Sequence, residues 1–177
     1  MNESDLKKNF LTSMRSSTST VCVISAKSDT LRHAMTAISV TSLSVDPPSM
    51  LVCINKEASI HSIIAVDSSF CINTLSSEQK DIAEICSNSE EGETRFLNNA
   101  WKDDGSYIYN QESLSTLFCE CTDLIDHSSH TIVIGRVSKV LNNDDLQPLL
   151  YGSGKYLNYY EIFYILLISF FIFVYFF

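Results

Sequence analysis

The chain is poor in glycine and lacks the glycine-rich motifs that cradle nucleotide phosphates. It has five glycines in 177 residues, and none of them belongs to a G-x-G-x-x-G fingerprint or a P-loop. A Rossmann-type dinucleotide-binding fold is therefore excluded. If a nucleotide binds, hydroxyl groups, helix N-termini or an arginine must hold its phosphates.

The chain also lacks a cluster of basic residues. Twelve lysines and arginines stand against 21 aspartates and glutamates, which gives a formal net charge of −9. Nucleic-acid binding depends on clustered Lys and Arg, so we expect no nucleic-acid partner. The densest charges are acidic and typical of solvated loops, as at Glu90-Glu91, Asp103-Asp104 and Asp144-Asp145.

No C-x-x-C pair occurs among the six cysteines, so neither a zinc site nor a redox dithiol is indicated. Five of the six lie in apolar runs, which favours buried free thiols in a reducing compartment. Cys119 and Cys121 would share one face of a strand, where two core thiols are favoured over a metal site. From the cysteine spacing we expect no bound metal. The polar N-terminus has no signal-peptide pattern, so we expect a cytoplasmic protein.

The hydrophobic pattern predicts mostly strands with short helices. Apolar and β-branched runs bounded by polar residues predict strands at residues 20–26, 36–43, 50–55, 70–75, 116–124 and 130–141. Helices are expected at residues 59–66 and after the capping box Ser76-Ser77-Glu78-Gln79. Residues 87–104 are polar and predict a long loop. The spacing indicates a mainly antiparallel barrel with helices on its flank, in one domain over residues 1–156.

The stretch HAMTAISVTSLSVDPPSMLVCIN, residues 33–55, carries most information about function. Small and hydroxyl residues precede a turn at Asp46-Pro47-Pro48, and an apolar strand follows. Such a polar segment can offer hydroxyls and backbone N–H groups to an anionic, planar ligand.

Together with other motifs in order, this stretch closely resembles the flavin reductase-like family. These motifs lie at residues 14–15, 21–25, 58–61, 70–75, 95–96, 119–121, 130–137, 148–151 and 154–156. The resemblance implies an FMN-binding split β-barrel and hydride transfer from NADH or NADPH to FMN or FAD. It also implies a homodimer that supplies reduced flavin to a partner monooxygenase.

The resemblance assigns the flavin contacts to thirteen residues: Met35, Thr36, Ala37, Ser39, Thr41, Ser42, Cys53, Ile54, Asn55, Ser59, Ile60, Arg95 and Phe96. Ser59 stands at the start of a predicted helix, where a serine can be a plain N-cap or can bind an anion. The family favours the second role, against flavin phosphate. Arg95 and Phe96 would reach the phosphate or the adenine side from the long loop.

His130 and Tyr156 are the candidates for contact with the nicotinamide. From the residues alone, His130 can be an ordinary turn histidine, and the pair His127-x-x-His130 is an incomplete metal site. The resemblance instead places His130 beside the flavin and the nicotinamide as the catalytic residue, with a positioning and electrostatic role. It places Tyr156 over the nicotinamide.

The C-terminal tail, residues 157–177, departs from the family pattern. Residues 162–177 are apolar apart from Ser169 and two tyrosines, and sixteen residues fall short of a membrane span. The segment from residue 159 can be a tail anchor, a dimer or membrane-surface segment, or an aberrant terminus, which is slightly favoured. Two further functions stay open: a flavin-binding protein without turnover, and a membrane-tethered interaction protein that uses the barrel as a scaffold.

Overall fold

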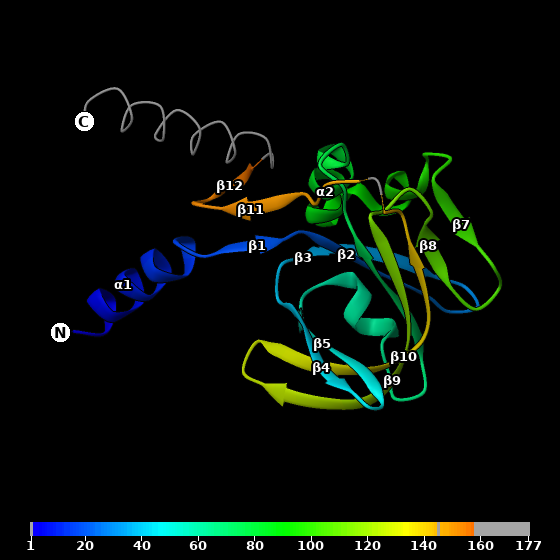
Figure 1. The fold of residues 1–177 in the computed structure, drawn as a ribbon. Helices are drawn as coiled ribbons and strands as arrows, with labels where there is room; N and C mark the ends of the chain where they lie inside the picture. Colours follow the sequence, from blue (N-terminus) through cyan, green and yellow to red (C-terminus); the bar gives the residue numbers. More distant parts are fainter. Residues whose placement is uncertain (1, 145, 158–177) are drawn as a thin grey trace, which may run out of the picture.

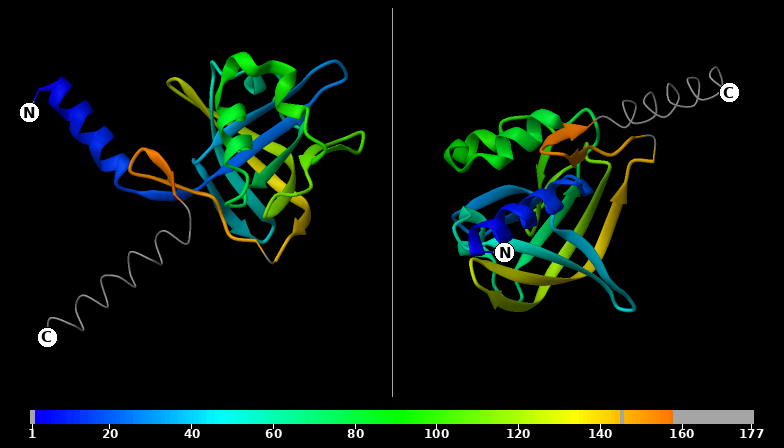
Figure 2. Two further views of the ribbon diagram at one scale, coloured as in Figure 1. Left: turned by 90° about the horizontal axis from the view of Figure 1, so that it is seen from above. Right: turned by 90° about the vertical axis from the view of Figure 1, so that its left-hand side faces the viewer.

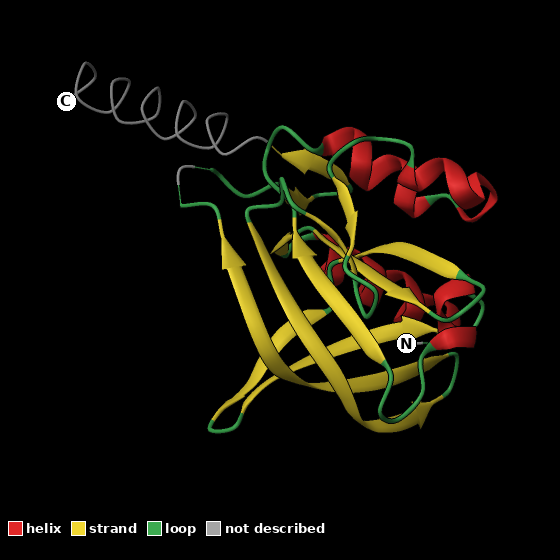
Figure 3. Cartoon of the chain, turned by 90° about the vertical axis from the view of Figure 1, so that its right-hand side faces the viewer, coloured by secondary structure: helices red, strands yellow, loops and turns green. Residues whose placement is uncertain are grey.

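The fold is built around one antiparallel sheet of seven strands. The computed structural model describes residues 2–144 and 146–157. The seven strands are β2 (Cys22–Lys27), β3 (Arg32–Ala37), β4 (Val40–Val45), β5 (Pro48–Asn55), β6 (Ser69–Thr74), β9 (Ser115–His127) and β10 (His130–Asn142). Their order in the sheet is β3-β2-β6-β9-β10-β5-β4. Since β3 and β4 lie at opposite edges but only Ile38 and Ser39 separate them in the chain, the sheet must curl into a barrel, as Figure 3 shows.

Short elements cover the barrel. They are η1 (Ser59–Ile63), α2 (Lys80–Ser87), η2 (Ser89–Phe96), β7 (Trp101–Asp103) and β8 (Ile108–Asn110). Of these, η1 packs into the core inside the barrel, and the others lie on one flank. The apolar stripe of α2, formed by Ile82, Ala83 and Cys86, packs against residues of β2 and β3. In Figure 1, α2 lies above these two strands.

A helix and a small sheet extend away from the barrel. The helix is α1 (Glu3–Arg15), and the three-stranded sheet has the order β1-β11-β12, formed by β1 (Thr18–Thr20), β11 (Leu150–Gly152) and β12 (Lys155–Leu157). Figures 1 and 2 show α1 projecting from the body of the molecule. None of its residues is buried.

The barrel wall has an apolar core on each of its two sides, because side chains alternate along a strand. On β2, Cys22, Ile24 and Ala26 pack inside the barrel, whereas Val21, just before the strand, and Val23 pack outside against α2. Inside, Gly135 lies under the ring of Phe70, and a Cβ at this position would clash with that ring. We call these two sides the inner core and the outer layer.

Four sequence-based predictions of local structure need correction. The predicted strand 36–43 is broken at Ile38 and Ser39, where the sheet closes. The predicted helix 59–66 is only a 3₁₀ turn, because the backbone becomes extended at Ile64. The predicted loop 87–104 contains η2 and β7, and α1 was not predicted. The capping box is half formed: the Ser76 N–H donates to Gln79 Oε1, and the helix begins after Gln79.

The apolar tail from residue 158 onward lies outside the described residues. The domain boundary predicted at residues 156 and 157 therefore stays a prediction. Within residues 2–144 and 146–157, no helix is long and apolar enough to cross a membrane.

Candidate functional site

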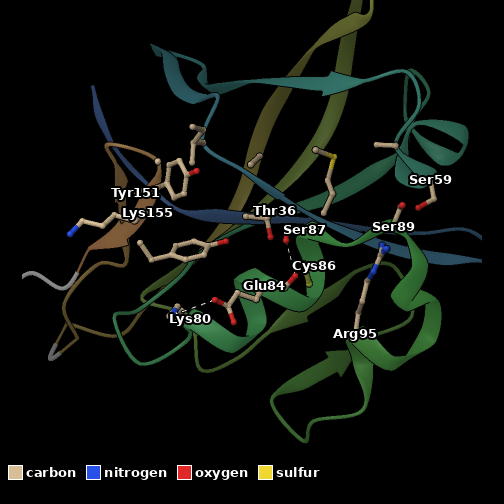
Figure 4. Close-up of a pocket in the computed structure, with 16 residues that line it drawn as sticks. Thr36, Ser59, Lys80, Glu84, Cys86, Ser87, Ser89, Arg95, Tyr151 and Lys155 are labelled. Carbon is tan, nitrogen blue, oxygen red and sulfur yellow. Dashed lines mark hydrogen bonds and ion pairs between the residues drawn. The ribbon is translucent and has the colours of Figure 1, made fainter. Parts of the chain in front are cut away.

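The candidate site is a cavity of about 870 Å³ between β3, α2, η2 and the β11–β12 hairpin (Figure 4). We call it the first pocket. Its lining combines hydroxyl groups, aromatic rings and charged side chains: Met35, Thr36, Ala37, Ile38, Ala58, Ser59, Lys80, Glu84, Cys86, Ser87, Ser89, Arg95, Tyr151, Gly154, Lys155 and Tyr156. Its size is in the range of ordinary small-molecule sites.

Arg95 forms a buried cationic end of the first pocket. Its side chain is 4% exposed, and its terminal nitrogens donate to the carbonyl oxygens of Ala34, at 2.6 Å, and Asn88. Its Nε has no hydrogen-bond partner. In Figure 4 the guanidinium points toward Ser59 and Ser89, whose hydroxyls also lack partners among the described residues. A buried cation without a carboxylate partner is costly, so this end favours an anionic ligand.

Two tyrosines form the opposite end. Tyr151 and Tyr156 meet edge to face, with ring centroids 5.3 Å apart and an interplanar angle of 72°. Burial raises the pKa of the Tyr156 phenol, and the nearby Glu84 carboxylate raises it further. The phenol therefore stays protonated and able to donate a hydrogen bond. Glu84 itself pairs with Lys80, at 3.3 Å.

The charge of the lining is opposite to that of the chain. Lys80, Arg95 and Lys155 line the first pocket, and among the described residues Glu84 is the only acidic one in the lining. The chain as a whole carries a net charge of −9. A local excess of positive charge in an acidic protein indicates an anionic ligand.

Thr36 joins two walls of the first pocket. Its Oγ1 donates to the carbonyl oxygen of Ala83, at 2.7 Å, and so ties β3 to α2. The hydroxyl hydrogen is thus used within the protein, and only the oxygen can accept from a ligand. Cys86 does not provide a nucleophile, because burial raises the pKa of its thiol to about 12, although Arg95 opposes this effect.

The structure brings only some of the predicted site residues into the first pocket. Six line it: Met35, Thr36, Ala37, Ser59, Arg95 and Tyr156. Thr41 and Ser42 line a second pocket of about 410 Å³, which shares Ile38 with the first. Ile38 thus separates the predicted residues before it, which line the first pocket, from Thr41 and Ser42, which line the second, although all of them belong to one short segment of the sequence.

Three predicted residues make contacts at the seam between β4 and β5. The hydroxyl of Ser39 donates to the Cys53 carbonyl oxygen, at 3.2 Å, and the Cys53 N–H donates to the Ser39 carbonyl oxygen. The side chain of Asn55 accepts from the N–H of Glu57, at 3.0 Å, which shapes the turn before η1. These polar groups already have protein partners.

Three further predicted residues are core residues by their side chains. Ile54 and Ile60 are buried in the inner core, so only their backbone could contact a ligand. Phe96 packs edge to face on Trp101, with ring centroids 5.0 Å apart, and does not line the first pocket. Arg95 and Phe96 are adjacent in the chain, yet η2 directs one toward the pocket and the other into the outer layer.

His130 is exposed at the start of β10 and does not line the first pocket. It is paired with Asn55 on β5, and its Nδ1 lies 3.0 Å from the Ser129 hydroxyl. Ser59, which does line the pocket, lies four residues after Asn55. The proposed catalytic role of His130 stays a prediction.

The sequence analysis did not predict several residues of α2, η2 and the β11–β12 hairpin that line the first pocket. The missed residues with polar side chains are Lys80, Glu84, Ser87, Ser89, Tyr151 and Lys155. Only the i,i+4 spacing of Lys80 and Glu84 offered a signal, and that spacing is equally typical of any exposed helix face.

Comparison with known proteins decides the family. The model of the flavin reductase like domain family matches residues 14–159. The chain belongs to this family. The resemblance seen in the sequence and the mainly β, split-barrel fold predicted from it are thereby confirmed.

Individual relatives agree with this assignment. The chain is 32% identical over 152 residues to the reductase component of an FADH₂-dependent resorcinol hydroxylase from Rhizobium sp. (strain MTP-10005), covering 84% of this chain and 85% of the relative. It is 28% identical over 152 residues to an NADH-dependent FMN reductase of Yersinia enterocolitica, covering 85% and 83%. Among solved structures, BorF, the flavin reductase component of a bacterial two-component tryptophan halogenase, is 27% identical with a TM-score of 0.77, covering 85% of this chain and 96% of that one.

Proposed function

We propose that the chain is a flavin reductase that transfers hydride from NADH to FMN or FAD in the first pocket. The reduced flavin then serves a separate monooxygenase. The names of the relatives support this activity, because they include NADH-dependent FMN reductases and the reductase component of a hydroxylase.

The buried guanidinium of Arg95 carries the proposal. Its Nε lacks a partner, no carboxylate neutralises it among its recorded contacts, and two unpartnered serine hydroxyls lie in the same part of the pocket. A phosphate group suits this end of the pocket, because its oxygens accept charge-assisted hydrogen bonds from the guanidinium that lines it and from the two serine hydroxyls. Arg95, Ser59 and Ser89 therefore hold the flavin phosphate.

The remaining wall suits a planar ring. Ala37 and Thr36 are small and allow a ring to approach the backbone of β3, and the oxygen of Thr36 can accept from it. When bound, the flavin supplies the hydride-accepting ring, and the protein supplies orientation and exclusion of water. Hydride transfer to the flavin ring therefore needs no pair of acidic and basic residues on the chain.

The nicotinamide is assigned to the tyrosine end of the pocket. Tyr156 covers it, and the protonated phenol offers a hydrogen bond. The role of His130 in positioning the nicotinamide is kept as a prediction: at the β9–β10 turn it pairs with Asn55, four residues before Ser59, and it does not line the first pocket. Replacement of His130 by Ala should lower turnover by tens-fold and leave flavin affinity nearly unchanged.

The active form proposed here is a homodimer. The exposed stripe of α1, which includes Leu6, Phe10, Leu11 and Met14, has no partner within the described chain. A second copy would bury it. Light scattering of the full chain should give the dimer mass, and Phe10→Asp should shift it toward the monomer; a wild-type monomer that reduces flavin would overturn this part of the proposal.

The decisive experiment measures flavin binding and NADH oxidation by the purified protein. Flavin fluorescence should be quenched on titration with FMN or FAD, and NADH absorbance should fall when flavin is added. Arg95→Met should weaken flavin binding about ten- to hundredfold, because a buried charge-assisted contact to phosphate is lost. Arg136→Met is the matched control, since Arg136 lies on the surface and pairs with Glu120.

The possible results separate the candidate functions. Quenching with NADH oxidation supports the reductase, whereas quenching without oxidation identifies a flavin-binding protein without turnover. Absence of quenching at tens of micromolar flavin would make the site assignment wrong.

A further inference from the structure

A chain of polar contacts crosses from η1 to the end of β9, outside the first pocket. Thr131 on β10 lies at its centre and is 2% exposed. Its Oγ1 donates to Asp126 Oδ1, at 2.7 Å, and lies 2.9 Å from Nε2 of His61. Lys56 Nζ completes the chain, 3.3 Å from Asp126 Oδ2.

The direction of these hydrogen bonds follows from counting protons. The threonine hydroxyl has one hydrogen, and it is used on the Asp126 carboxylate, which only accepts when ionised. The contact with His61 must therefore be donation from the imidazole Nε2–H to the threonine oxygen. A neutral imidazole with its proton on Nε2 and a protonated imidazole both make this bond.

Packing fixes η1 on one side only: Ile60 is buried in the inner core, whereas His61 faces a cavity. This cavity, of about 280 Å³, lies between η1 and the β9–β10 strands. It is lined by Ile64, Leu124, Val133 and three of the four residues of the chain of contacts, His61, Asp126 and Thr131. Strand β10 is already held by its backbone pairing, in which Thr131 faces Ile54 on one side and Asp126 on the other. The hydroxyl donates to Asp126 on the neighbouring strand, and its oxygen remains able to accept from His61 and so to orient η1.

We propose that Thr131 is a positioning residue that orients η1, so that Ser59 presents its hydroxyl to the flavin phosphate. The proposal rests on the function assigned to the first pocket. Ser59 and His61 belong to the same five-residue turn, so the bond from His61 to Thr131 sets the rotation of that turn. A small displacement of a ligand-binding group is enough to lose a hydrogen bond.

The test compares Thr131→Val with Thr131→Ser. Valine keeps the shape and removes both hydrogen bonds, whereas serine keeps the hydroxyl. The Kd for FMN should rise about tenfold in Thr131→Val and stay within threefold of the wild type in Thr131→Ser. At saturating FMN, kcat should change less than threefold, because the hydride-transfer geometry is left in place. Thr122→Val is the matched control, since Thr122 on β9 donates to a strand carbonyl and touches neither pocket.

A second pair of variants keeps the proposal falsifiable if Thr131→Val does not fold. His61→Phe removes the donor, and His61→Gln keeps an N–H group in a similar place; only the first should weaken FMN binding. If the wild type binds FMN and neither Thr131→Val nor His61→Phe weakens that binding, Thr131 has no positioning role. A lower melting temperature with unchanged Kd would likewise show a purely structural role. If the wild type itself binds no flavin, it is the proposed function that fails.

Discussion

The inner core and the outer layer of the barrel wall are both buried, but they are filled in different ways. The inner core is a cluster of apolar side chains such as Ile24, Phe70 and Ile72. On the outer side of the same strands, Ser25, Asn73 and Thr116 are buried and hydrogen-bonded. The inner side thus depends mainly on shape, with Thr131 as a buried polar exception, whereas the outer side depends on a network of specific polar partners.

The polar group of the outer layer is a connected network centred on Asn73. Its side chain donates to Ser25 Oγ and to the Val23 carbonyl oxygen, both at 2.9 Å, and accepts from the N–H of Asn110 on β8. Asn110 in turn accepts from the side chain of Gln79, at the start of α2. The network therefore links the barrel wall to the helix that lines the first pocket, which the inner core does not do.

The inner core should show the largest effect on stability and little effect on binding. Ile24→Ala removes a fully buried side chain, so we expect a loss of about 2–5 kcal/mol in the free energy of unfolding by urea. The Kd for FMN, measured where the variant is still folded, should stay close to the wild-type value. A parallel loss of affinity would mean that the two sides of the wall are not independent.

The outer network should show a smaller loss of stability but a clear loss of binding. Asn73→Ala leaves buried donors and acceptors without partners, so we expect a loss of about 2–3 kcal/mol. The Kd for FMN should also rise, because β8 and the start of α2 lose their shared anchor. Thr122→Val is the control: its hydroxyl donates to the Ile134 carbonyl oxygen on β10, and it does not line the first pocket. Unchanged FMN affinity in Asn73→Ala would contradict the link to the pocket.

A single contact between β3 and α2 refines the comparison. Thr36→Val removes the hydrogen bond to the Ala83 carbonyl oxygen and keeps the side-chain shape, so the loss of stability should be about 1 kcal/mol. The free energy of FMN binding should fall by more than the free energy of unfolding does, since Thr36 itself lines the pocket. Thermal unfolding together with flavin titration measures both quantities, and an effect on stability alone would exclude Thr36 from the site.

The smallest effect is expected at the surface pair of Lys27 and Asp103, 2.7 Å apart. The hydrogen bond from Lys27 lowers the pKa of the Asp103 carboxyl, and the N–H of Gly105 lowers it further. A lowered folded-state pKa contributes stability above the unfolded value near 4, and this stability is lost as the pH falls through the folded pKa. Lys27→Met should therefore destabilise by less than about 1 kcal/mol at pH 7 and by still less below pH 4. A constant difference across this pH range would rule out the pair as its source.

The main strands could be predicted from the sequence because their signal is local. Alternating apolar residues and β-branched runs predict β5, β6, β9 and β10 within a few residues of their observed bounds. The helix α1 was missed although Leu6, Phe10 and Met14 recur at helical spacing, because the prediction considered the N-terminus only for its polar composition. The break at Ile38 and Ser39 escaped because it depends on the closure of the sheet, which no local pattern records.

The sequence by itself determined the alternation of side chains along each strand, and the order of its motifs determined the family. Only the tertiary structure decided which polar groups share a pocket. Thr36 and Thr41 are five residues apart but line different pockets, whereas Arg95 and Lys155 are sixty residues apart and line the same one. The physical reason is that alternation follows from the backbone of each strand, while convergence in a pocket depends on how the sheet closes and where α2 packs.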